Sequence, residues 1–131
     1  MYIHLKIIGV LLTLLAFLHI GFSKYFNWKE ELSTLSLINQ QMMKVHTFFI
    51  AFVVFLIGVL CFTSTKEIIE TNLGRKIAFG LSLFWFVRLV FQFFVYSPML
   101  WKGKIFETIM HVLFTLFWVY LSTVFFIIYL N

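Results

Sequence analysis

The sequence has few charged side chains, one proline and one cysteine among its 131 residues. Charged residues make up 11% of the chain, whereas soluble domains carry about 25%, so the polar side chains are too few to cover a soluble enzyme. The low charge and high hydrophobicity also exclude intrinsic disorder. Because Cys61 stands alone, one chain cannot form a disulfide or a cysteine-based zinc or iron–sulfur site. These absences point to a protein of the lipid bilayer.

Apolar residues make up 63% of the sequence and fall into four long runs. The runs cover residues 2–22, 43–62, 74–96 and 105–130, and each reaches the length of about 20 residues that a membrane-spanning helix needs. The first run is too long for the apolar part of a secretory signal and no small-residue cleavage pattern follows it, so we expect it to be retained. The sequence therefore predicts an all-α, polytopic membrane protein with one transmembrane domain, residues 1–131, folded as an up-down bundle of four transmembrane helices.

The connection between the first two runs, residues 23–42, contains charged, aromatic and amide side chains. Asn27 and Glu30 have the spacing of a capping box, with Asn in place of the usual Ser or Thr. Apolar side chains that would then share one helix face are Leu32, Leu35 and Ile38. This pattern predicts a short helix lying in the membrane interface.

The other two connections are shorter. Residues 63–73 predict a polar hairpin, and residues 97–104 predict a tight turn. Within this turn Pro98 would end the third helix and Trp101 would lie at the level of the lipid head groups. Small residues such as Gly9 and Thr13 on the first run and Gly58 on the second predict surfaces on which membrane helices approach closely.

The net charge of +5 comes from 10 basic and 5 acidic residues scattered between the apolar runs. This pattern favours contact with anionic lipid head groups and not with nucleic acid. We expect a multi-pass protein of the bacterial inner (cytoplasmic) membrane. Four basic residues at the ends of the runs and in the connections would lie on one side of the membrane, and five on the other: Lys6, Lys66, Arg75 and Lys76 against Lys24, Lys29, Lys44, Lys102 and Lys104. A difference of one does not orient the chain by the positive-inside rule.

An up-down arrangement would bring most polar residues of the apolar runs to one end of the bundle. These residues are His19, His46, Arg88, Gln92, Tyr96, Glu107 and His111. Arg88, Gln92 and Tyr96 follow one another at i+4 steps, which places them on one helix face. Glu107 and His111 share a face of the next run in the same way. We expect the two faces to meet, with Arg88 and Gln92 at about the depth of Glu107 and His111, and Arg88 in contact with Glu107 or Gln92. The seven residues form a candidate cofactor-binding site.

Each member of this set also has a structural explanation. A charge inside a span costs at least about 2.5–3.5 kcal/mol, and Arg88 could offset that cost either in a binding site or in a structural ion pair with Glu107. The histidines could be interfacial side chains bonded to carbonyl groups, and Tyr96 could anchor its helix in the aromatic belt. His46 lies away from the small-residue face of its helix and is the least securely placed member.

Three ligand classes match the residue types. Haem b would use two histidines as axial ligands and an arginine for a propionate, while a quinone or an anionic lipid would accept hydrogen bonds from Arg88, Gln92 and His111. A tightly bound metal ion is not expected, because Arg88 would repel it. Two other functions stay open, a non-catalytic subunit or assembly factor of a larger membrane complex, and a small oligomeric transporter or channel. The sequence does not decide whether the protein is an enzyme. We expect its protein partners to be further copies of the same chain or other membrane subunits.

Overall fold

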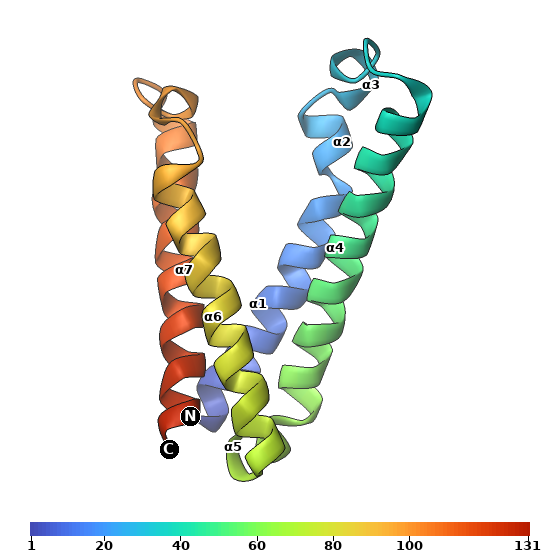
Figure 1. Ribbon diagram of the computed structural model, residues 1–131. Helices are drawn as coiled ribbons and strands as arrows, with labels where there is room; N and C mark the ends of the chain where they lie inside the picture. Colours follow the sequence, from blue (N-terminus) through green and yellow to red (C-terminus); the bar gives the residue numbers. More distant parts are fainter. The chain divides into compact units, whose positions relative to one another are not determined.

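A computed structural model describes residues 1–131 as helices joined by short connections (Figure 1). The elements are α1 (Tyr2–Ile20), α2 (Phe22–Tyr25), α3 (Trp28–Glu31), α4 (Leu37–Thr63), α5 (Thr65–Glu70), α6 (Asn72–Phe94), the 3-10 helix η1 (Pro98–Leu100) and α7 (Ile105–Leu130). Four of them, α1, α4, α6 and α7, are long and apolar enough to cross a membrane. The prediction of an all-helical chain with four such segments is confirmed. The chain divides into two compact units, which are described separately: residues 3–65 and residues 66–131 with Met1 and Tyr2.

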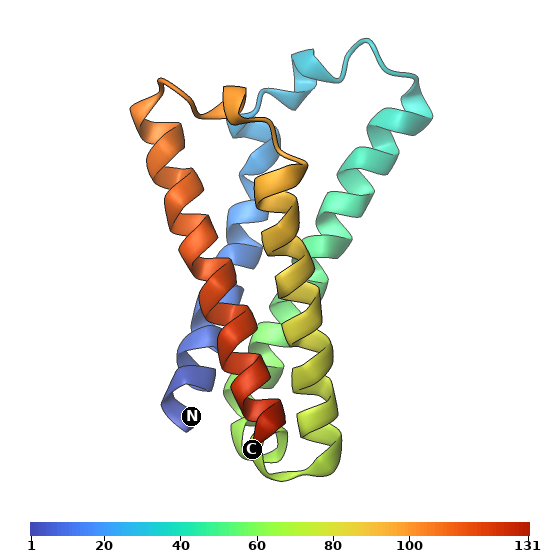
Figure 2. The ribbon, with the colours of Figure 1, turned by 60° about the vertical axis from the view of Figure 1, so that its left-hand side comes forward.

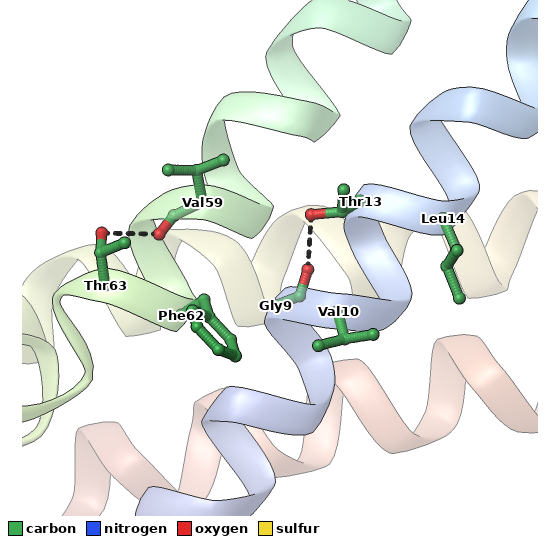
Figure 3. Close-up of a pocket in the computed structure, with 7 residues that line it drawn as sticks. All are labelled: Gly9, Val10, Thr13, Leu14, Val59, Phe62 and Thr63. Atoms are coloured by element: carbon green, nitrogen blue, oxygen red, sulfur yellow. Dashed lines mark hydrogen bonds between the residues drawn. The ribbon is translucent and has the colours of Figure 1, made fainter.

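The α1–α4 unit, residues 3–65, is a helical hairpin whose two long helices cross at glycine. A Cβ atom added to Gly9 would lie 2.8 Å from the carbonyl oxygen of Gly58, and one added to Gly58 would lie 2.8 Å from Oγ1 of Thr13. The Thr13 hydroxyl donates to the Gly9 carbonyl at 2.8 Å, so it adds no unpaired polar group to the crossing (Figure 3). The close approach predicted from the small residues is confirmed here.

The connection between α1 and α4 differs from its prediction. Instead of one interfacial helix it holds the single-turn helices α2 and α3. Asn27 adopts a left-handed conformation with φ 55°, and its amide nitrogen donates to the Glu30 carboxylate at 3.0 Å, so its side chain does not cap the backbone. The capping box and the single apolar stripe are therefore wrong. Helix α4 begins at Leu37, six residues before the predicted span, because the Ser36 hydroxyl accepts from the backbone N–H of Asn39 at 3.5 Å.

The α6–α7 unit is an antiparallel hairpin with α5 packed at its base (Figure 2). Thr71 caps α6 by accepting from the backbone N–H of Gly74 at 2.9 Å. Gly74 is buried against the backbone of α5. Any side chain at position 74 would collide with backbone atoms of Glu67 and Ile68. Further along the hairpin, the Ser82 hydroxyl donates to the carbonyl oxygen of Ser122 at 2.9 Å. The two helices thus meet along the faces that their sequence pattern predicted.

Candidate functional site

A chain of three polar side chains joins α6 to α7. Nη1 of Arg88 donates to Oε1 of Gln92 at 3.3 Å, one helical turn further along α6. Nε2 of Gln92 then donates across to Nδ1 of His111 on α7 at 3.2 Å, and to the His111 carbonyl oxygen at 3.3 Å. Gln92 is buried and has donors and acceptors satisfied on both sides. The expected contact between Arg88 and Gln92 is confirmed.

This network fixes the chemistry of the His111 ring. Arg88 has only donors, so the Gln92 amide must turn its oxygen toward Arg88 and its nitrogen toward His111. With the amide in this orientation Nδ1 of His111 accepts from Gln92, so Nε2 is the ring nitrogen that can donate to a ligand. Trp101 stacks on the same ring, with centroids 4.7 Å apart and 22° between the planes. His111 is thereby held as a donor through Nε2.

The Arg88 guanidinium lies over two aromatic rings. Its Cζ atom is 5.0 Å from the centroid of Trp118 and 5.2 Å from that of Tyr96. Trp118 also stacks on Trp85, with centroids 5.1 Å apart and 7° between the planes. Both indole N–H groups are buried and have no hydrogen-bond partner. Arg88 makes no ion pair, and its only side-chain acceptor is the neutral amide of Gln92. This region of the hairpin therefore has more donors than acceptors.

Glu107 does not take part in this network. Of the four residues expected at about one depth, Gln92 and His111 meet, whereas the alternative of an ion pair between Arg88 and Glu107 is wrong. The contacts Gln92–His111 and Trp85–Trp118 set the register of the two antiparallel helices. That register places Glu107 at the level of residue 96, eight residues from Arg88, or about 12 Å at 1.5 Å per helical residue. Arg88 instead lies at the level of the tryptophan pair.

The remaining two predicted site residues belong to the α1–α4 unit. His19 is half-buried, and its Nδ1 donates to the carbonyl oxygen of Leu15 at 2.8 Å. It lines a cavity of about 640 Å³ that also borders α2, α3 and α4. His46 is exposed and does not line this cavity. The structure thus brings together Arg88, Gln92, Tyr96 and His111 within one unit, and His19 and His46 are described apart from them.

Sequence reasoning did not assign the tryptophans to the site. Trp85 and Trp118 fall on the polar faces of their helices by helical spacing, a signal that placed them there but could not show that their rings stack. Trp101 was expected to be an aromatic-belt anchor, and its stacking on His111 depends on the path of the connection between α6 and α7. The position of Trp85, three residues before Arg88 on the same helix, is a signal that could have assigned Trp85 to the site, but no such signal marks Trp118.

No protein-family model matches the chain, and comparisons with curated proteins and with solved structures found no match. The chemistry of the described residues is therefore what bears on function. No group of three or more His, Cys, Asp or Glu side chains gathers as a metal site. The α6–α7 network instead offers N–H donors, from Arg88 and His111, to a ligand that carries acceptor oxygens.

Proposed function

We propose that this chain is a multi-pass protein of the bacterial inner (cytoplasmic) membrane whose α6–α7 hairpin binds the anionic head group of a lipid. The observation that carries the proposal is the unbalanced charge of Arg88, which is half-buried, touches two aromatic rings and has no carboxylate partner. Cation–π contacts contribute about 0.5–2 kcal/mol each, and they leave the net charge in place. An anion supplied by the surrounding membrane would balance it.

The donor set also favours an anionic oxygen over the other ligands considered. Haem held by two axial histidines would need a second histidine beside His111, and the unit that contains the α6–α7 hairpin has none. A quinone carbonyl would accept from the same donors but would not balance the charge of Arg88. A phosphate or carboxylate oxygen satisfies both requirements, since charge-assisted hydrogen bonds from arginine are about twice as strong as neutral ones.

The proposed topology is an up-down bundle of four crossings with both termini on one side. Its support is the order of elements, four long apolar helices that alternate with three polar connections. Many bulky apolar side chains on these helices are exposed, for example Phe17, Phe48 and Leu116. Such a surface fits lipid tails, a second copy of the chain or other membrane subunits, so a role as a subunit of a larger complex is compatible with lipid binding.

A lipid-retention experiment tests the head-group site. The full chain is purified in neutral detergent, and co-purifying anionic lipid is counted by native mass spectrometry. We expect Arg88→Gln to reduce retained anionic lipid about tenfold or more, because one charge-assisted hydrogen bond is worth about 1.5–3 kcal/mol. Arg75→Gln is the matched control, because it removes the same charge from α6 where Arg75 contacts Asn72 and the carbonyl oxygen of Asn131.

Three outcomes would overturn the proposal. Equal retention by both variants would show that Arg88 does not hold the lipid. A Soret band in the purified protein that disappears in His111→Ala would assign the site to haem. A co-purifying quinone lost with Arg88→Gln, with anionic lipid unchanged, would assign it to a neutral carbonyl ligand.

A further inference from the structure

The α1–α4 unit contains a second cationic region, separate from the hairpin network. It is the cavity of about 640 Å³ next to His19, and it lies where α1 ends and the polar connection to α4 begins. Three lysines line it, Lys24 on α2, Lys29 on α3 and Lys44 on α4. We call it the lysine cavity. Its volume falls within the range of about 300–1,000 Å³ that is usual for small-molecule sites.

The lining of the lysine cavity carries positive charge without compensation. No aspartate or glutamate lines it, and none of the three lysines makes an ion pair in the structure. The nearest acidic residue along α3, Glu30, accepts a hydrogen bond from Asn27. All three lysines are exposed, so their ammonium groups are accessible to an anion. The cavity is thus matched to a ligand with more than one negative charge.

The same cavity also has an apolar wall. Ile20 of α1 and Phe48 and Ala51 of α4 line it beside the lysines. Lys44 directly precedes the most apolar part of α4, so the cavity spans the change from polar connection to apolar helix. Trp28, another lining residue, has the side chain type that favours the membrane interface. A ligand that fills this cavity would have a charged head and an apolar body.

His19 completes the polar part of the lining. Its Nδ1 proton is donated to the Leu15 carbonyl oxygen, so Nε2 is the ring nitrogen left for a ligand. Ser23 and Thr47 supply hydroxyl groups at the same cavity.

We propose that the lysine cavity binds a lipid whose head group is a phosphomonoester or a diphosphate. A phosphomonoester carries about −1.5 to −2 charges at neutral pH, which suits three ammonium groups better than the single charge of a phosphodiester. The apolar wall accounts for the lipid body, and the volume exceeds what an inorganic phosphate would fill. This site lies in the unit that does not contain Arg88, and it does not depend on the hairpin site.

The test uses the full chain with Arg88→Gln in every sample, so that the hairpin site cannot contribute. Phosphatidic acid is titrated in phosphatidylcholine nanodiscs, and bound lipid is counted by native mass spectrometry. We expect neutralisation of the cavity by Lys24→Gln, Lys29→Gln and Lys44→Gln together to weaken binding at least tenfold. The matched control neutralises three lysines outside the cavity, Lys66, Lys102 and Lys104, and is expected to change binding less than twofold.

An arginine variant and a second lipid serve as further controls for the specificity of binding. Replacement of the three cavity lysines by Arg keeps the charge and should keep the affinity, which separates a charge effect from misfolding. Phosphatidylglycerol, with one negative charge, should bind more weakly than phosphatidic acid. Equal losses in the cavity and control triple variants would overturn the proposal, because they would show unspecific attraction to positive charge. Binding of free pyrophosphate as tight as that of phosphatidic acid would also overturn it, because the ligand would then be soluble.

Discussion

At the scale of single residues, Gln92 determines how the α6–α7 network is arranged. It is the one side chain that contacts both Arg88 and His111, and it is 7% exposed. Its amide can do so because it offers an acceptor on one side and donors on the other. A carboxylate at this position would accept from Arg88 and would balance its charge, and it would need the proton of the His111 ring on Nδ1. The amide therefore leaves the positive charge of Arg88 unbalanced.

Gln92→Leu should lower the stability of the protein by about 1–3 kcal/mol, because buried polar groups left without partners carry a desolvation cost of that size. Unfolding by sodium dodecyl sulfate, followed by circular dichroism, measures the free energy of unfolding. Gln41→Leu is the matched control, since Gln41 is exposed and lies on α4. Similar stability of the two variants would show that the network contributes nothing to the fold.

The residue scale also shows how far sequence alone could reach into the site. Arg88 and Gln92 are four residues apart on one helix, so their contact follows from helical geometry. The contact of Gln92 with His111 depends on the register between two helices, which helical spacing does not determine. Glu107 was assigned to the wrong depth for this reason. The stacking of Trp101 on His111 depends on the conformation of the η1 connection, for which the sequence offers only Pro98 as a signal.

At the scale of elements, apolar length predicted α1, α6 and α7 to within two residues at each end. It failed for the start of α4, where the residues from Leu37 to Met42 include Asn39 and two glutamines. Hydropathy ended the predicted span at this polar stretch, but backbone hydrogen bonds and the Ser36 cap continue the helix through it. The length of an apolar run thus predicts the part of a helix that can cross the membrane. It does not predict the polar turns by which the same helix continues beyond that part.

The crossing of α1 with α4 gives a prediction at this scale. Gly9→Ala should destabilise the protein by about 1–3 kcal/mol, the usual cost of overpacking, because the new methyl group would lie 2.8 Å from a backbone oxygen of α4. Gly80→Ala is the matched control, because nothing lies within 4 Å of an added Cβ there. Its stability should stay the same or rise by up to about 1 kcal/mol through helix propensity. Detergent unfolding curves of both variants measure the difference, and equal destabilisation would contradict the close contact.

At the scale of the whole molecule, each proposed site lies near a connection between two long helices. The lysine cavity borders the α1–α4 connection, and the Arg88 network lies toward the α6–α7 connection. In an up-down order these two connections are on the same side of the membrane, whereas the α4–α6 connection is on the other. The proposed order of crossings can therefore be tested at the three connections.

Cysteine labelling tests this order of crossings. In a Cys61→Ala background, which removes the one native thiol, single cysteines replace exposed residues in the connections: Thr34, Lys102 and Lys66. A membrane-impermeant maleimide is added to intact cells and to inverted vesicles. Because each apolar helix that crosses the bilayer moves the chain to the other side, Thr34→Cys and Lys102→Cys should react from the same side and Lys66→Cys from the opposite one. Asn131→Cys should react together with Lys66→Cys, since α6 and α7 add two crossings between them.

Labelling of Thr34→Cys and Lys66→Cys from one side would mean that α4 does not cross the bilayer.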